Sequence, residues 1–133
     1  MGVIQGSCGC GNITFQFDAT NTSLINCHCD MCRIHNGSAF SSYVIARRDG
    51  FILNDEAKRL TSYHNDNVAK YFCADCGTPI YNSHDNYGSI FLVYLGALQE
   101  TREMRPGINV WCENQLPWVT EISAIKSVAQ GAG

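Results

Sequence analysis

Short runs rich in apolar and β-branched residues recur along the chain, and glycine or other turn residues separate them. Residues Ile13 to Phe17 alternate between apolar and polar side chains, which is the period of a strand with one buried face. Residues Ser89 to Leu95 form a mostly apolar run that is short enough to be a core strand. The pattern predicts strands over Ile13–Phe17, Ala39–Ala46, Arg59–His64, Ala69–Phe72, Ile80–Asn82, Ser89–Leu95, Ile108–Cys112 and Trp118–Ile122.

Signals for helix are scarce. Asp30 is placed to cap a single helical turn through Arg33 to His35, which the pair Asn36-Gly37 would end. No linker, repeat or low-complexity segment divides the chain. We therefore predict a mostly β fold of antiparallel hairpins with very little helix. It would form one domain over residues 1–133, with a frayed tail at 128–133.

The composition is that of an ordinary globular domain, with 45% hydrophobic residues among 133 and a formal net charge of −3. No basic stripe is present, which argues against a nucleic-acid partner. No apolar run approaches the roughly 20 residues that span a bilayer, and the first residues lack the features of a signal peptide. These observations predict a cytoplasmic protein with reduced cysteines. Reduced cysteines at short spacings indicate metal binding.

Seven of the eight cysteines lie in three clusters with the spacing of metal ligands. In a strand, residues i and i+2 point to the same face, so a C-x-C sequence can present two thiolates to one metal. A C-x-x-C sequence does the same in a tight turn, and a following glycine permits a backbone conformation that other residues resist. The clusters are Cys8-Gly9-Cys10, Cys27-His28-Cys29-Asp30-Met31-Cys32 and Cys73-Ala74-Asp75-Cys76-Gly77.

The two outer pairs predict a closed, structural zinc site. Zinc binds thiolates at about 2.3 Å and prefers four ligands in a tetrahedron, which two pairs fill. Cys8, Cys10, Cys73 and Cys76 would then tie the N-terminal hairpin to the middle of the chain. Disulfide bonds, or a redox pair at Cys73 and Cys76, are alternatives that the compartment and the lack of a βαβ pattern disfavour.

The middle cluster predicts a second zinc with an open position. Three protein ligands are typical of catalytic zinc, where water or substrate takes the fourth place. In the alternative, the site is closed by His28, His35 or Cys112. His35 is the best placed of these, because it follows Cys32 by three residues on the same side of the possible helical turn.

The order of the motifs resembles the glutathione-dependent formaldehyde-activating enzymes, a family that includes the centromere protein V relatives. The pattern is C-x-C, C-x-C-x-x-C-R, C-x-x-C-G-T-x-[IL], L-G-x-L and a late P-W. The motifs read Cys8-Gly9-Cys10, Cys27-His28-Cys29-Asp30-Met31-Cys32-Arg33, Cys73-Ala74-Asp75-Cys76-Gly77-Thr78-Pro79-Ile80, Leu95-Gly96-Ala97-Leu98 and Pro117-Trp118.

The resemblance implies a tent-like all-β fold of stacked sheets with two zinc ions per chain. The structural zinc would lie on the four outer cysteines, and the second on Cys27, Cys29 and Cys32. The implied activity is that of a carbon–sulfur lyase, similar to S-(hydroxymethyl)glutathione synthase. Its substrate would be the adduct of a thiol such as glutathione with a small aldehyde such as formaldehyde. Relatives often carry histidine where this chain has Asn109.

Two other hypotheses compete with the enzyme. In the first, both zinc ions are structural, and the protein is a non-catalytic module that binds a protein or a small molecule. In the second, the protein carries zinc or a thiol, and the metal of the middle cluster is exchangeable. The coordination of that metal separates the first of these from the enzyme.

Three charged residues adjoin the ligands. Arg33 is a candidate for binding a substrate carboxylate, with a structural role as the alternative. Asp30 and Asp75 lie within the turns of the motifs, where aspartate usually caps backbone N–H groups.

Other residues near the motifs are assigned to the interior. Cys112 is outside the three clusters and is predicted to be a buried free thiol. The aromatic residues predicted in the core are Tyr43, Phe72, Tyr81, Trp111 and Trp118.

Overall fold

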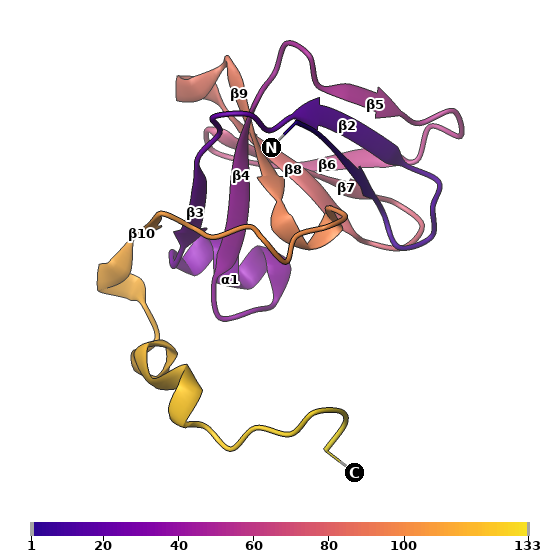
Figure 1. The fold of residues 1–133 in the computed structure, drawn as a ribbon. Helices are drawn as coiled ribbons and strands as arrows, with labels where there is room; N and C mark the ends of the chain where they lie inside the picture. Colours follow the sequence, from indigo (N-terminus) through magenta and orange to yellow (C-terminus); the bar gives the residue numbers. More distant parts are fainter. Residues whose placement is uncertain (1, 133) are drawn as a thin grey trace.

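The computed structural model describes residues 2–132, whose strands form two sheets (Figure 1). The smaller sheet has the order β1-β2-β5 and contains β1 (Val3–Ser7), β2 (Thr14–Asp18) and β5 (Ile52–Asn54). The larger sheet contains, from edge to edge, β10 (Ile108–Val110), β3 (Leu24–Cys27), β4 (Ser41–Arg47), β9 (Ile90–Tyr94), β8 (Pro79–His84), β7 (Val68–Cys73) and β6 (Leu60–Asn65).

Helical structure within the described residues is short. The α-helix, α1, spans Asp30–Asn36 and ends at Gly37, whose φ of 73° is in the left-handed region that favours glycine. The remaining helical turns are 3-10 helices: η1 (Asp85–Tyr87), η2 (Leu95–Ala97), η3 (Cys112–Asn114) and η4 (Pro117–Ala124).

The prediction of a mostly β single domain is confirmed, but the structure differs from the predicted elements in three respects. The pattern missed β1, β3 and β5, because they are five, four and three residues long and each contains a polar residue or glycine. Residues Trp118 to Ile122 are not a strand but lie within η4. The sheet is also not wholly antiparallel, because β10 pairs with β3 in parallel. That pairing places a late segment of the chain beside Cys27.

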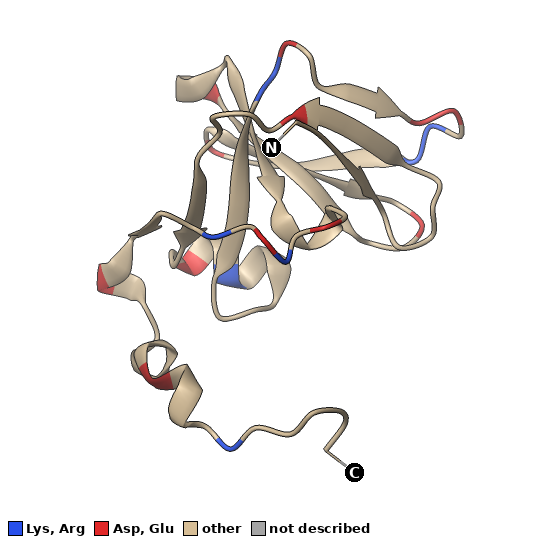
Figure 2. Cartoon of the chain, in the orientation of Figure 1, with Lys and Arg blue, Asp and Glu red and all other residues tan. Residues whose placement is uncertain are grey.

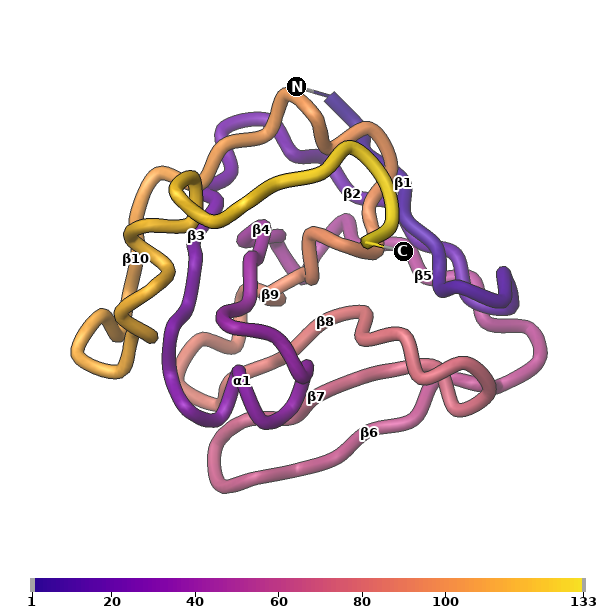
Figure 3. Tube along the Cα trace, turned by 90° about the horizontal axis from the view of Figure 1, so that it is seen from below, coloured from indigo at the N-terminus to yellow at the C-terminus, as the bar shows by residue number. Residues whose placement is uncertain are grey.

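An aromatic cluster joins the two sheets. Phe15 and Phe17 lie on the buried face of β2, and the ring of Phe51 stacks on both, with centroids 5.5 and 5.8 Å away. Phe51 also contacts Tyr81 and Phe91 from the larger sheet, with centroid distances of 5.4 and 5.2 Å. Burial of these large apolar rings is the main driving force for holding the sheets together. Figure 3 shows β1, β2 and β5 on one side of the molecule and β6, β7 and β8 along another.

Gly6 of β1 is required by a close approach to this cluster. A Cβ atom at this position would lie 2.2 Å from Cζ of Phe15, a ring that has little freedom to move because it is 2% exposed. We expect Gly6→Ala to lower the free energy of unfolding by about 1–3 kcal/mol, the usual cost of overpacking a core. Denaturant unfolding measures this. Gly2→Ala is the matched control, because a Cβ there meets nothing within 4 Å. Equal stability of the two variants would contradict the prediction.

The chain leaves the two sheets after β10 and extends away from them (Figure 1). Trp111 and Trp118 were predicted in the core, but they are 59% and 44% exposed. Cys112 is exposed and not buried as predicted. The cause is shared: these residues follow β10, beyond which no described strand pairs with the sheets. Residues 128–132 are exposed and outside any helix or strand, and residue 133 of the predicted tail is outside the described residues.

Charged residues are distributed over the turns, strand ends and the C-terminal segment (Figure 2). Both signs of charge occur in these segments, and same-sign neighbours such as Arg47 and Arg48 occur beside opposite charges such as Asp49. None of the described helices is both long and apolar enough to cross a membrane.

Candidate metal centres

Four cysteines from two distant parts of the chain meet in one cluster. The sulfurs of Cys8, Cys10, Cys73 and Cys76 all lie within 4.8 Å of one another. The Sγ atom of Cys10 is 3.6 Å from that of Cys8 and 3.8 Å from that of Cys73. A disulfide bond would require about 2.05 Å. The four thiols are thus free, and the cluster can hold a metal ion.

The spacing of these sulfurs fits a tetrahedral thiolate site. Sulfurs at about 2.3 Å from a central zinc lie about 3.8 Å apart along the edges of the tetrahedron. The separations of 3.6 and 3.8 Å agree with that edge. The side chains are therefore spaced as a four-thiolate metal site requires.

Cys8 and Cys10 lie in a turn and not in a strand, because β1 ends at Ser7. The turn is closed by a hydrogen bond from the Gly11 N–H to the Cys8 carbonyl, at 3.1 Å. The Cys8 sulfur also accepts a bond from the Ile13 N–H, at 3.3 Å. The two thiols converge as predicted, but a turn and not the face of a strand brings them together.

Cys73 and Cys76 lie in a second turn, which begins at the end of β7. The Gly77 N–H donates to the Cys73 carbonyl at 2.8 Å, and Gly77 has a φ of 75°. This conformation is the one for which glycine was expected after the second cysteine.

Thr78 links the two turns. It belongs to the sequence motif, but the motif alone does not reveal this role. Its Oγ1 accepts a hydrogen bond from the Gly9 N–H at 2.9 Å and lies 3.2 Å from the Cys76 sulfur. The hydroxyl proton can therefore be donated to that sulfur. This hydrogen bond is the main cause that lowers the pKa of Cys76 to about 5. A hydroxyl two residues after the second cysteine was the signal available in the sequence.

Asp75 braces the second turn through side chains, whereas capping of backbone N–H groups was expected. Its carboxylate pairs with Arg59 at 2.7 Å and accepts a bond from the Asn12 amide at 2.8 Å. The Arg59 guanidinium is the main cause that lowers the pKa of Asp75. The hydrogen bond from Asn12 to Asp75 is a second link between the two cysteine turns, because Asn12 follows Cys10 closely and Asp75 lies between Cys73 and Cys76.

The second cluster consists of three cysteines from one turn of the chain. The sulfurs of Cys27, Cys29 and Cys32 lie within 4.8 Å of one another. Cys27 and Cys32 are buried, and Cys29 is half-buried. Among the described residues, no nitrogen of His28 or His35 and no sulfur of Cys112 joins this group. The cluster therefore offers three protein ligands.

The turn is built by the end of β3 and the start of α1. The strand ends at Cys27, and Cys29 is the N-cap of the helix, with its sulfur accepting the Cys32 N–H at 3.3 Å. The predicted cap was Asp30, which instead pairs with Arg33. The thiol of Cys29 replaces the side-chain oxygen that usually caps a helix, and this fixes its position relative to Cys32.

The pKa values of the three thiols diverge. Hydrogen bonding from the Cys27 thiol lowers the pKa of Cys32 to about 5 against the effect of burial, and the Tyr43 hydroxyl adds to the lowering. Hydrogen bonding to Cys32, together with burial, raises the pKa of Cys27, and burial raises that of Cys29. Metal binding requires all three as thiolates and would release the protons that Cys27 and Cys29 carry.

His28 lies between two of the cysteines, and its side chain is buried. Its Nε2 is 3.2 Å from Oδ1 of Asn109, which also accepts a bond from the Asn26 amide at 3.1 Å. Since that oxygen is an acceptor, His28 donates through Nε2. The ring stands 4.9 Å from that of Phe40, and Nδ1 has no hydrogen-bond partner. Asn109 thus orients the ring of His28.

Arg33 ties the turn to a segment near the C-terminus. One nitrogen, Nη1, donates to the His28 carbonyl at 2.6 Å and to the Asn114 carbonyl at 2.7 Å. The other, Nη2, pairs with Asp30. These bonds give Arg33 a structural role, and its contact with a substrate carboxylate stays a prediction.

A cleft of about 460 Å³ has neighbours of both clusters in its lining. Ser41, which pairs with Cys27 across β3 and β4, lines it, and so does Thr78, whose Oγ1 lies 3.2 Å from the Cys76 sulfur. All its lining residues are uncharged: Asn36, Ser38, Phe40, Ser41, Ser42, Thr78, Pro79, Tyr94, Leu95, Gly96 and Ala97.

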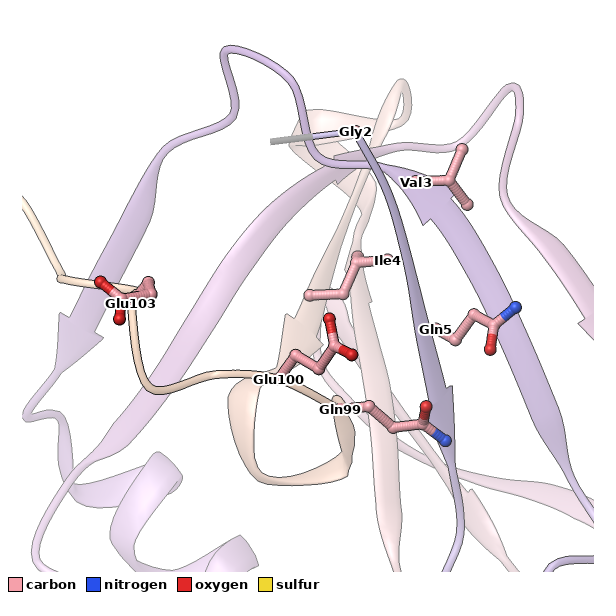
Figure 4. Close-up of a pocket in the computed structure, with 7 residues that line it drawn as sticks. All are labelled: Gly2, Val3, Ile4, Gln5, Gln99, Glu100 and Glu103. Carbon is pink, nitrogen blue, oxygen red and sulfur yellow. The ribbon is translucent and has the colours of Figure 1, made fainter.

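A wider hollow of about 610 Å³ lies elsewhere, between β1 and the chain that follows η2 (Figure 4). Its lining includes Ile4, Gln99 and the carboxylates of Glu100 and Glu103, but no cysteine. It is therefore separate from the candidate metal chemistry.

Two thiol clusters on a mostly β, two-sheet domain define a protein able to hold metal through cysteine. A family model for the glutathione-dependent formaldehyde-activating enzymes matches residues 3–114. The chain belongs to this family.

Individual relatives are distant. An uncharacterized lyase of Schizosaccharomyces pombe is 27% identical over 82 residues, which is 62% of this chain. The match spans 58% of the length of that lyase. A crystal structure of a Rhodobacter sphaeroides protein shares the fold, with a TM-score of 0.62 and 18% identity, over 79% of this chain and 98% of that one.

Proposed function

We propose that this protein is a zinc-dependent lyase that makes or breaks the carbon–sulfur bond of a thiol–aldehyde adduct. The proposal rests on the three-cysteine cluster, which offers three converging thiols and no fourth ligand among the described residues. Three protein ligands with an open position are typical of catalytic zinc. The family and the lyase relative support the same class of reaction.

Zinc is the metal we infer for both clusters. In the four-cysteine cluster, the sulfur–sulfur separations of 3.6 and 3.8 Å suit its tetrahedral preference, and thiolate is among its favoured ligands. The four-cysteine site would be structural. Cys27, Cys29 and Cys32 would hold the second zinc, which would lower the pKa of an incoming thiol and polarise a carbonyl.

The reaction needs no oxidant or reductant. In the direction of synthesis, the thiol sulfur bonds to the aldehyde carbon, and the carbonyl oxygen gains the proton that the thiol loses. The lyase direction reverses these steps. The chain contributes by holding three thiolates in a turn that is braced by two later residues, because Arg33 bonds to Asn114 and His28 bonds to Asn109. Glutathione and formaldehyde are the substrates that the family name suggests.

A non-catalytic binding module is the alternative, and one observation favours it. The segment after η3 exposes large apolar residues, among them Trp118, Ile122 and Ile125, each at least 44% exposed. Exposed apolar groups of this kind are typical of surfaces that bind partners. X-ray absorption that finds four protein ligands at both metals would favour this alternative.

NMR exchange spectroscopy tests the enzyme directly. Zinc-loaded protein should accelerate exchange between glutathione, formaldehyde and their adduct beyond the rate in buffer. An exchange rate equal to that of buffer, with both zinc ions present by metal analysis, would refute the proposal. We further infer a reducing compartment such as the cytoplasm, because disulfide formation would remove the ligands.

A further inference from the structure

A buried chain of polar side chains lies behind the three-cysteine cluster. The Asn82 amide of β8 donates to the Tyr43 hydroxyl of β4 at 3.2 Å. That hydroxyl lies 3.2 Å from the sulfur of Cys32. The exposed fractions are 5% for Asn82, 1% for Tyr43 and 8% for Cys32, so water does not compete for these bonds. Such bonds are stronger than their exposed equivalents.

The direction of the chain follows from the protons available. The Tyr43 oxygen accepts from Asn82, and its single proton is free for one acceptor. A cysteine that binds metal is a thiolate and has no proton to donate. Tyr43 must therefore donate to Cys32 whenever the cluster holds metal, and the bond is then charge-assisted.

The sheet fixes this geometry. Tyr43 pairs with Tyr94 across β4 and β9, and their rings meet edge to face with centroids 4.9 Å apart. Tyr94 is also buried, yet its hydroxyl has no hydrogen-bond partner. The two tyrosines are neighbours of the same size, and only the Tyr43 hydroxyl is within hydrogen-bond distance of Cys32.

We propose that Tyr43, oriented by Asn82, is a positioning residue that tunes the metal through Cys32. A hydrogen bond to a thiolate withdraws electron density from sulfur, so the sulfur donates less to the metal and the metal becomes more electrophilic. The consequence for catalysis rests on the proposed function, but the effect on the metal does not. Neither residue would touch the substrate.

Cobalt substitution provides the test, because Co²⁺ in a thiolate site has sulfur-to-metal charge-transfer bands. Tyr43→Phe should move these bands to lower energy, because the lone pairs of the Cys32 sulfur lose the hydrogen bond that stabilises them. Metal affinity of the three-cysteine cluster should fall about 10- to 100-fold, the usual effect of removing a hydrogen-bond partner of a ligand, because the Cys32 thiolate then loses a donor that stabilises it against protonation. Tyr94→Phe is the matched control and should leave the charge-transfer bands and the metal affinity unchanged.

Asn82→Leu provides a second variant if Tyr43→Phe does not fold. It removes the donor to the Tyr43 oxygen and should shift the bands in the same direction by a smaller amount. Unchanged bands in Tyr43→Phe or in Asn82→Leu, or an equal shift in Tyr94→Phe, would overturn the proposal. Absence of lyase activity in the wild type would refute the proposed function alone, since the band shift does not depend on turnover.

Discussion

Replacing Cys73 with serine should lower the free energy of unfolding by at least about 3 kcal/mol, because the four-cysteine cluster joins distant parts of the fold. Cys73 is fully buried and its sulfur lies 3.8 Å from that of Cys10, 63 residues away along the chain. Loss of one ligand would weaken metal binding and leave a polar hydroxyl in its place. The melting temperature should fall by roughly 10 °C or more for a domain of this size.

Cys112→Ser is the matched control for this variant. Cys112 is exposed and outside both clusters, so its replacement should change stability by no more than about 0.5 kcal/mol. A chelator should destabilise the wild type in the same direction as Cys73→Ser, because the metal then no longer stabilises the folded state. Equal melting temperatures for the two serine variants would show that the four-cysteine cluster does not stabilise the fold.

Replacing Cys29 with serine should remove the second metal and the lyase activity while the fold persists. Cys29 is half-buried and caps a short helix, a role that serine also performs well. The expected result is one zinc per chain by metal analysis and a loss of exchange rate of more than about 100-fold. Circular dichroism should match the wild type.

The same Cys112→Ser variant controls for the loss of any thiol. It should keep two zinc ions and the full rate. A Cys29→Ser protein that retains the wild-type rate would place the chemistry away from the three-cysteine cluster. A Cys29→Ser protein that loses the rate but keeps two zinc ions would show that Cys29 contributes to catalysis in a way other than binding metal.

The sequence predicted the clusters better than it predicted their backbone. Spacing alone groups the seven cysteines correctly, because few arrangements bring short-spaced thiols to one point. It does not reveal whether a strand or a turn presents them. Cys8 and Cys10 converge through a turn, and Cys29 itself caps the helix. The sulfurs of Cys8 and Cys29 accept backbone N–H groups in these turns, in addition to being candidate metal ligands. The sequence pattern does not reveal that these sulfurs accept hydrogen bonds.

The residues around the ligands were harder to predict. Tyr43 is a buried strand residue, as expected, but its contact with Cys32 depends on the pairing of β3 with β4. Asn82 and Asn109 are polar residues in strands, where a sequence without its topology indicates only solvent exposure. Arg33 reaches Asn114 because β10 joins the sheet in parallel. Contacts of this kind depend on tertiary pairing that local patterns do not contain.

Exposure of the tryptophans was mispredicted for a different reason. Large aromatic residues usually favour the interior, so Trp111 and Trp118 were placed there. The chain turns away from the sheets after β10, and the family model matches only as far as residue 114. Composition gives no signal for such a departure.

The two cysteine clusters differ in the length of chain that each must close. The three-cysteine cluster is contained in one turn, so the entropy lost on gathering its ligands is small. The four-cysteine cluster joins sulfurs whose residues are 63 apart, and the cost of closing a loop rises with its length. During synthesis, a nascent chain therefore has every ligand of the three-cysteine cluster long before Cys73 emerges from the ribosome. Metal can enter the three-cysteine cluster before the sheets form, whereas the four-cysteine cluster can fill only when the sheets assemble.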